Sequence, residues 1–311
     1  MLRTVRIATH CLIIASLVAT STALATAVNV SGVRSSAVSF SGMAVDAATG
    51  EAYELTGYGP GYGGTSPTTL TRYDNAAAFE AGTPSGTVTS TSNLWGTYIA
   101  AQNGNVFGRA STTLDVSGWP ADAKTTKISG TTGATQLTVS VAGMDSRSFD
   151  WGGASGVSAM NDGTHLYIVG GAGGSSDWRI TSFDYDLNQL NSVSFSPANQ
   201  PGWAFAINNH IFFGEDFNSG QISTRVNATT GAVDAINFTL TGFNGGLPYM
   251  DSASYDAFND TLYLHSAGVG FYKVSNAAQV FAVPEPEAYA MMLAGLVLVG
   301  AVARRKKQAE T

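Results

Sequence analysis

Cysteine is almost absent from this chain of 311 residues, and the single one, Cys11, lies near the N-terminus. It lacks the small residues that precede a lipoprotein cysteine, and a mature protein without the N-terminal segment has no disulfide and no thiol nucleophile. Charged residues are also scarce, at 12% of the chain, against about 25% in a typical globular protein. Gly, Ser, Thr, Asn and aromatic residues take their place, which is typical of a secreted β-rich protein with many turns.

Basic residues are few in the central part of the chain. Residues 28–282 contain 9 Lys and Arg against 19 Asp and Glu, a formal charge of −10. This balance excludes nucleic acid as a partner, because phosphates are bound by Lys and Arg, and it disfavours anionic lipid. These 255 residues are enough for one large core or for a ring of small sheets.

Catalytic motifs are missing as well. Gly-x-Ser-x-Gly does not occur, and the Gly-rich stretches lack the strand and helix that flank a phosphate-binding loop. The acidic pair Glu215-Asp216 has no identifiable catalytic partner in the sequence. We therefore expect no catalytic residue, no metal site and no cofactor, with calcium as the one ligand considered below.

The N-terminal segment has the pattern of a secretory signal peptide. Arg3 and Arg6 precede a mostly apolar stretch at residues 7–18, and small residues follow. They offer two cleavage sites, Ala23-Leu24-Ala25 and Ala25-Thr26-Ala27. We expect residues 1–27 to be removed, and the small-residue sites make a simple N-terminal anchor the weaker interpretation.

A unit of strand, tight turn and strand recurs five times between residues 43 and 264. The turns centre on Gly50, Gly104, Gly163, Asn209 and Asp260, at spacings of 54, 59, 46 and 51 residues. Asn-Gly and Asp-Gly between apolar runs indicate hairpins. A third strand follows each hairpin and a fourth follows most of them; the third strands are marked by Arg72-Tyr73-Asp74, Lys127-Ile128-Ser129, Ser182-Phe183-Asp184, Arg225-Val226-Asn227 and Lys273-Val274-Ser275.

This order predicts an all-β domain, a β-propeller-like ring of about five four-stranded blades spanning residues 28–282. The spacing is close to the roughly 40–50 residues of a propeller blade. We expect residues 28–40 to pair with the last blade, whose outer strand would be residues 278–282, and Phe212 to be buried in a second strand. A β-sandwich or jelly roll is the alternative, because its short strands also alternate with turns.

Several residues suggest chemistry but have simpler interpretations. His165, His210 and His265 fall in or beside second strands and could bind a metal or move protons. Tyr53 and Phe107 occupy similar places in other units, which favours a packing role. Trp151, Trp178 and Trp203 could stack on sugars, but burial in strands explains them better.

Two acidic segments partly match a calcium loop. Asp184-Tyr185-Asp186-Leu187-Asn188 has alternating oxygen ligands but lacks Gly at its sixth position and Glu at its twelfth, which the loop requires. Asp216-Phe217-Asn218-Ser219-Gly220 is equally incomplete. We interpret both as turns, although calcium suits an exported acidic protein.

The C-terminus contains three elements in order. Val283-Pro284-Glu285-Pro286 is followed by an uncharged run at residues 288–303 and then by Arg304-Arg305-Lys306-Lys307. The run is shorter than the roughly 20 residues of a comfortable membrane-spanning helix. The prolines keep the preceding segment extended, and the basic cluster is expected to stay in the cytoplasm and stop transfer.

This arrangement resembles the PEP-CTERM sorting signal of Gram-negative, exopolysaccharide-producing bacteria. The resemblance covers residues 283–311 and implies processing by exosortase, a membrane transpeptidase, near the Pro-Glu-Pro motif. It predicts an exported, non-enzymatic protein, held transiently in the inner membrane and then placed at the cell surface or in the matrix, where it contacts exopolysaccharide. The alternatives are an ordinary C-terminal anchor and a secreted propeller enzyme that acts on glycans or lactones.

Overall fold

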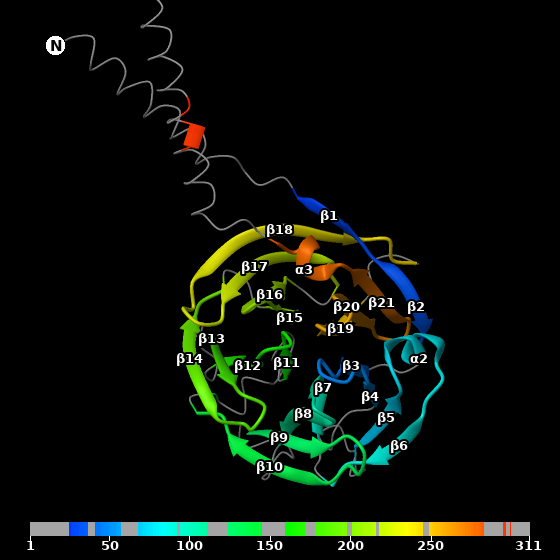
Figure 1. Ribbon diagram of the computed structural model, residues 1–311. Coiled ribbons are helices and arrows are strands. Elements are labelled where there is room, and N and C mark those ends of the chain that lie inside the picture. The colour runs from blue at the N-terminus through cyan, green and yellow to red at the C-terminus, as the bar shows by residue number, and fades with distance from the viewer. Residues whose placement is uncertain are drawn as a thin grey trace, which may run out of the picture. The chain divides into compact units, whose positions relative to one another are not determined.

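The computed structural model describes residues 25–36, 41–56, 68–91, 94–110, 124–142, 144, 159–171, 178–197, 201–215, 218–244, 249–282, 295, 296 and 299. The chain divides into two units, Met1–Ala277 and Ala278–Thr311. The described part of the first unit consists of small sheets arranged around a common axis (Figure 1).

Five sheets form the ring. Four of them contain four consecutive strands, and the fifth contains three consecutive strands and one N-terminal strand. Blade 1 is β3 (Ser41–Val45), β4 (Ala52–Thr56), β5 (Thr69–Tyr73) and β6 (Gly86–Thr89). Blade 2 is β7 (Leu94–Gln102), β8 (Asn105–Ala110), β9 (Lys124–Ser129) and β10 (Thr135–Ser140). Blade 3 is β11 (Met160–Asn161), β12 (Leu166–Gly171), β13 (Trp178–Phe183) and β14 (Gln189–Phe195). Blade 4 is β15 (Trp203–Ile207), β16 (His210–Gly214), β17 (Gln221–Asn227) and β18 (Val233–Thr241). Blade 5 is β19 (Met250–Asp256), β20 (Thr261–Ser266) and β21 (Gly270–Ser275) with one strand from elsewhere.

The fold is therefore a five-bladed β-propeller, as the repeat predicted. Within each blade the consecutive strands pair antiparallel. The first strands β3, β7, β11, β15 and β19 line the axis, and the fourth strands lie at the rim (Figure 1). The described strands do not form the two facing sheets of a β-sandwich, which was the alternative fold.

Two N-terminal strands close the ring. β2 (Ser31–Ser35) pairs antiparallel with β21 and completes blade 5, while β1 (Thr26–Asn29) pairs parallel with β18 and adds a fifth strand to blade 4. The expectation that the N-terminal segment pairs with the last blade is thus confirmed for β2. The expected outer strand at residues 278–282 is wrong, because Ala277–Val280 forms the short helix α3. β2 already occupies the edge of β21, and Ala and Gln in this segment favour helix.

The five hairpin turns have the backbone that the sequence predicted. Gly50, Gly104 and Gly163 have φ of 77°, 72° and 87°, and Asn209 and Asp260 have φ of 60° and 49°. Asn and Asp adopt this left-handed region more readily than other side chains do. The periodic Gly, Asn and Asp residues therefore mark the sites where each first strand reverses into the second.

Buried aspartates at the ends of first strands hold these turns, and two of them also reach the next blade. Asp46 Oδ1 accepts hydrogen bonds from the backbone N–H of Ala48 (2.8 Å) and Thr49 (3.0 Å) in its own turn. The same carboxylate accepts from the N–H of Asn103 (3.1 Å) and Gly104 (2.6 Å) in the turn of blade 2. One fully buried side chain thereby fixes two turns.

Asp162 repeats this arrangement between blades 3 and 4. Its Oδ1 accepts from the N–H of Thr164 and His165, both at 2.9 Å, and its Oδ2 accepts from the N–H of Asn209 at 2.7 Å. Asp256 binds the N–H of Phe258 and Asn259 within its own turn. The turns between first and second strands lie on one face of the propeller, here called the turn face. This face is therefore stabilised by carboxylates as well as by packing.

The apolar core is divided among the seams between neighbouring blades. Tyr53 of blade 1 packs in one cluster with Ile99 and Val106 of blade 2. Phe107 of blade 2 packs with Leu166 and Ile168 of blade 3. Because each cluster draws on two blades, no blade buries its own faces alone, and the ring is stabilised as a unit.

A helix that the repeat does not contain reinforces the seam between blades 1 and 5. α2 (Ala76–Ala81) lies between β5 and β6, begins at its N-cap Asn75, and ends at Gly82 with φ of 66°. Its fully buried Phe79 contacts Tyr73 of blade 1 and Tyr263 and Phe271 of blade 5 edge to face, at centroid distances of 4.9–5.7 Å. This geometry is favourable for aromatic pairs.

Candidate functional site

The predicted sorting residues lie outside the described part of the chain. Val283, Pro284, Glu285 and Pro286, and the basic cluster Arg304, Arg305, Lys306 and Lys307, all fall in segments that the structure does not describe. Nearby, Gly295, Leu296 and Val299 are described and are helical. Among the described residues, no helix has both the length and the apolar character needed to span a bilayer.

Near the axis, first strands from opposite sides of the ring touch. The hydroxyl oxygen of Tyr98 on β7 accepts a hydrogen bond from the N–H of Ala204 on β15 at 3.3 Å, although blades 2 and 4 are not neighbours. Tyr98 is buried, and burial raises the pKa of its hydroxyl. The phenol therefore stays protonated and links the first strands of blades 2 and 4.

The three histidines are placed separately. His165 lies edge-on to Tyr167 at a centroid distance of 6.1 Å, and His210 Nδ1 lies 2.8 Å from the carbonyl oxygen of Asn208. His265 is fully buried on β20. Among the described residues, no group of three His, Cys, Asp or Glu side chains comes together to hold a metal ion.

His265 forms a buried pair with Asp251 of β19. Its Nδ1 lies 2.6 Å from Asp251 Oδ1, and its ring packs against Phe271 at a centroid distance of 4.6 Å. Burial raises the pKa of the Asp251 carboxyl, although the hydrogen bond with His265 opposes this change. Both side chains are buried in the core of blade 5.

The two calcium-like segments and the tryptophans have structural roles where they are described. Asp184 accepts from the N–H of Asp186 and Asn188 and from the Asn188 amide at 2.8–2.9 Å, which makes the segment a turn. Trp178 and Trp203 are buried in strands, as expected. Trp151 and the start of the segment at Asp216 lie outside the described residues.

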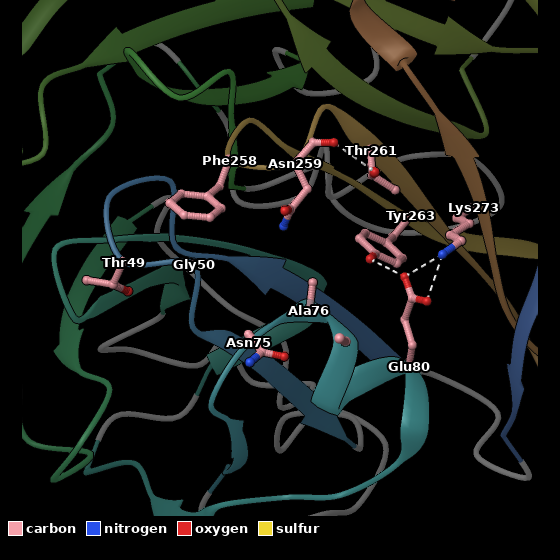
Figure 2. A pocket seen from close by; sticks show the side chains of 11 residues that line it. Thr49, Gly50, Asn75, Ala76, Glu80, Phe258, Asn259, Thr261, Tyr263 and Lys273 are labelled. Atoms are coloured by element: carbon pink, nitrogen blue, oxygen red, sulfur yellow. Dashed lines mark hydrogen bonds and ion pairs between the residues drawn. The ribbon is translucent and has the colours of Figure 1, made fainter.

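A pocket of about 380 Å³ opens on the turn face at the seam between blades 1 and 5 (Figure 2). This seam pocket is lined by the β3–β4 turn, the first turns of α2, the β19–β20 turn and strands β20 and β21. Its lining residues are Thr49, Gly50, Asn75, Ala76, Ala77, Glu80, Phe258, Asn259, Thr261, Tyr263 and Lys273. A volume of this size lies within the range of small-ligand sites, about 300–1,000 Å³.

One wall of the seam pocket is an ion pair whose charges cancel. Lys273 Nζ lies 2.7 Å from both carboxylate oxygens of Glu80, and the hydroxyl of Tyr263 donates to Glu80 Oε1 at 2.7 Å. Burial and the bond to Glu80 raise the pKa of Tyr263. Because the pair is neutral as a whole, this wall offers polar contacts without attracting one sign of charge.

The opposite wall is aromatic. Phe258 is 57% exposed and lies across the pocket from the Glu80–Lys273 pair (Figure 2). Its ring lies directly over Gly50, where a Cβ atom would be only 3.2 Å from the ring. Gly50 thus supports one face of the ring at a position that, with φ of 77°, already favours glycine.

Two asparagine amides lie between these walls. Asn75 Oδ1 caps α2 by accepting from the N–H of Ala78, and Asn259 Nδ2 donates to Asp256 Oδ2, both at 2.8 Å. The other amide atom of each side chain, Asn75 Nδ2 and Asn259 Oδ1, makes no hydrogen bond to a described residue. Both amides line the pocket, and each is held in place by one of these bonds.

Sequence reasoning did not find the seam pocket. Its residues come from two units at opposite ends of the repeat, and only ring closure brings Gly50 and Phe258 together. A local signal was present for the helix: Asn75, then six residues of which four are Ala and one is Glu, and then Gly82 are the marks of a capped helix. Nothing in the sequence indicated that this helix would pack on the last blade.

A comparison with protein families identifies the C-terminal segment. Residues 282–307 match the PEP-CTERM protein-sorting motif, a range that includes the positions of both predicted sorting clusters. The chain thus carries a PEP-CTERM motif at its C-terminus, behind a five-bladed β-propeller. The motif implies an exported protein that is sorted to the cell envelope and processed by exosortase. No curated protein matches the chain.

Two solved structures are among those that this chain matches at low sequence identity. Myxococcus xanthus glutaminyl cyclase has 10% sequence identity and a TM-score of 0.48, over 81% of this chain and 99% of that one. The Neurospora crassa Pan2 WD40 domain has 8% identity and a TM-score of 0.37, over 75% of this chain and 62% of that one.

Proposed function

We propose that this chain is a non-enzymatic protein of the cell surface or extracellular matrix, whose propeller binds an extracellular ligand. The PEP-CTERM motif at residues 282–307 is the observation that carries the proposal. An address outside the cell agrees with the low content of charged residues. The closed ring with a neutral polar pocket at one seam supports a binding role.

We further propose the route by which the protein reaches that location. Residues 1–27 direct export across the inner membrane of a Gram-negative bacterium, and residues 288–303 hold the protein in that membrane until it is processed. Arg304-Arg305-Lys306-Lys307 stays on the cytoplasmic side. Val283-Pro284-Glu285-Pro286 then lies at the outer face, where its two prolines keep it extended and accessible to exosortase.

Replacement of Pro284-Glu285-Pro286 by Ala-Ala-Ala in the native host tests this route. The altered chain should accumulate in the membrane fraction with its C-terminal tail uncut, because helix can continue outward and the recognised feature is lost. The unaltered protein should appear shortened at the surface or in the medium. Glu287→Ala, directly after the Pro284-Glu285-Pro286 tripeptide, is the control and should be processed normally. Equal shortening and release of the triple-alanine variant would show that the tail is an ordinary anchor.

The ligand that we propose is exopolysaccharide, bound in the seam pocket. Sugars present apolar ring faces and many hydroxyl groups, and the pocket pairs the supported ring of Phe258 with the amides of Asn75 and Asn259. Aromatic rings suit such amphipathic surfaces. The cancelled charges of Glu80 and Lys273 favour a neutral saccharide over a strongly ionic one.

Retention on the host's own polysaccharide, coupled to beads, tests this binding role. The processed protein should be retained, and Phe258→Ala should lose most of the retention. Leu190→Ala is the control, because Leu190 is 52% exposed on the rim of blade 3, away from the pocket. No retention of the unaltered protein, or equal loss with Leu190→Ala, would reject the seam pocket as a polysaccharide site.

A further inference from the structure

The N-terminal strand β1 bears on where the signal peptide ends. The sequence offers cleavage after Ala25 and after Ala27, and both sites have Ala at each of the two small-residue positions. The rule that small residues precede a signal-peptide cleavage site is therefore satisfied equally by both. The two cuts differ in what they leave for the folded domain.

The two candidate bonds differ in their place relative to β1. The strand runs from Thr26 to Asn29, with Thr26 opposite Phe238, Ala27 opposite Thr239, Val28 opposite Leu240 and Asn29 opposite Thr241. The bond between Ala27 and Val28 thus lies in the middle of a paired strand. The bond between Ala25 and Thr26 lies at its first residue.

A cut after Ala27 would damage this strand. It removes Thr26 and Ala27, which make two of the four register pairs, and uncovers part of the edge of β18, a surface prone to pairing with other chains. It also places a new charged amino group on Val28, which is only 4% exposed. Desolvating a charge without a partner is costly.

A cut after Ala25 has neither consequence. All four pairs of β1 remain, and the new amino group falls on Thr26, whose side chain is exposed. The remainder of the segment is anchored downstream by the N–H of Val30, which donates to the carbonyl oxygen of Thr241 at 2.8 Å. Once β1 is paired, the Ala27–Val28 bond is also protected, because its strand is already engaged with β18.

We propose that signal peptidase cuts between Ala25 and Thr26, so that Thr26 is the first residue of the mature protein. The boundary then lies two residues before the one expected at residue 28. The proposal rests on the expectation that the N-terminal segment is a secretory signal peptide. It assigns the last residues of the expected signal peptide to the propeller.

N-terminal sequencing and intact mass of the protein exported with its own N-terminus test the proposal. Thr26 is the expected first residue. A protein that begins at Val28 or at any other residue would overturn the proposed site, and a protein that keeps Met1 would overturn the signal peptide as well.

Two variants separate the sites, since each alters one of them only. Ala27→Phe removes the small residue before the second site and should leave the N-terminus at Thr26, because Ala27 is exposed in β1. Ala23→Phe removes a small residue of the first site and should reduce cleavage or move it to Val28, giving a product with a lower melting temperature. Blocked cleavage with Ala27→Phe but not with Ala23→Phe would overturn the proposal.

Discussion

The guanidinium of Arg34 forms an ion pair with the carboxylate of Glu54 and so ties the N-terminal strand of blade 5 to the second strand of blade 1. Glu54 also accepts from the hydroxyls of Tyr73 (2.6 Å) and Ser41 (3.1 Å). Burial, together with the bond to Glu54, raises the pKa of Tyr73 to about 12. Arg34 further lies 4.4 Å above the ring of Phe79, so that one side chain joins the closing strand, the inserted helix and the first blade.

Arg34→Met should therefore weaken the whole domain at its closure. Met preserves the contact with Phe79, but Glu54, only 5% exposed, loses its positive partner. Removing one member of a buried ion pair costs about 3–5 kcal/mol. Because Arg34 is partly exposed, we expect a loss of about 3 kcal/mol in unfolding free energy. Unfolding in urea measures the change.

The double variant Arg34→Met with Glu54→Gln isolates the reason for that loss. A neutral amide leaves no unpaired charge, so the double variant should be more stable than Arg34→Met alone. If the two variants unfold at the same urea concentration, the unpaired carboxylate is not the cause of the instability.

Asp46→Ala should destabilise two blades at once. The carboxylate accepts from four backbone N–H groups, two in each of two turns, and alanine leaves them without an acceptor. Buried unsatisfied groups cost about 1–3 kcal/mol each before relaxation, and we expect a net loss of about 3 kcal/mol in unfolding free energy. Asp74→Ala is the control: this exposed aspartate should change stability by less than about 0.5 kcal/mol. Similar stabilities of the two variants would contradict the bracing role of Asp46.

Phe212→Ala should cost roughly 3–5 kcal/mol, as expected for a large side chain removed from a tight core. Phe212 is 2% exposed and stacks on Phe205 of the neighbouring strand at 5.1 Å with an interplanar angle of 3°. Thermal unfolding provides the measurement, with Phe258→Ala as the exposed control. An unchanged melting temperature for Phe212→Ala would show that the ring is not part of the core.

The Asp251–His265 pair should make part of the stability depend on pH. Burial raises the folded pKa of Asp251, so the unfolded chain loses this proton first as the pH rises above the ordinary value of about 3.9. The protonated carboxyl therefore stabilises the fold at lower pH, and this contribution is lost as the pH rises through the folded pKa. Melting temperatures of the wild type relative to Asp251→Asn should fall as the pH rises from about 4 through the raised folded pKa of Asp251.

Asp184→Asn is the matched control for that series, because its sign is opposite. Burial acts to raise the pKa of Asp184, but hydrogen bonds from Asn188 and Asp186 outweigh burial and lower this pKa. Its contribution is present at neutral pH and is lost as the pH falls through the folded pKa. A constant difference between wild type and Asp251→Asn across the series would contradict a raised pKa at Asp251.

Local features of the sequence predicted most of the ring. Gly50, Gly104 and Asp260 recur at turns where backbone geometry restricts the residue type, and Tyr53 and Phe212 recur in strands whose faces are both covered. These signals lie within a few residues of one another, so they can be recognised without a structure. The stretch at residues 28–40 was expected to pair with the last blade, but the pairing of β1 with β18 was not predicted, because partners more than 200 residues apart leave no local signal.

The candidate binding site was beyond sequence reasoning for a related reason. Phe258 and Asn259 read as an ordinary turn, and Glu80 and Lys273 as ordinary surface charges. Their proximity follows from the meeting of blades 1 and 5, a long-range consequence of closure. By contrast, the sorting motif was recognised from sequence because its elements are contiguous and are read by a processing enzyme as a linear segment.

Because β2 completes blade 5, the ring can close only after the last blade has been synthesised. Ser31–Ser35 is among the first segments to be synthesised, but its partner Gly270–Ser275 is among the last. Until the last blade has been synthesised, β2 has no partner strand. The edge of β21 in turn stays unpaired until β2 binds to it. A chain that stops before β21 therefore cannot form the closed ring. Closure of the ring thus occurs only in chains whose whole propeller has been synthesised.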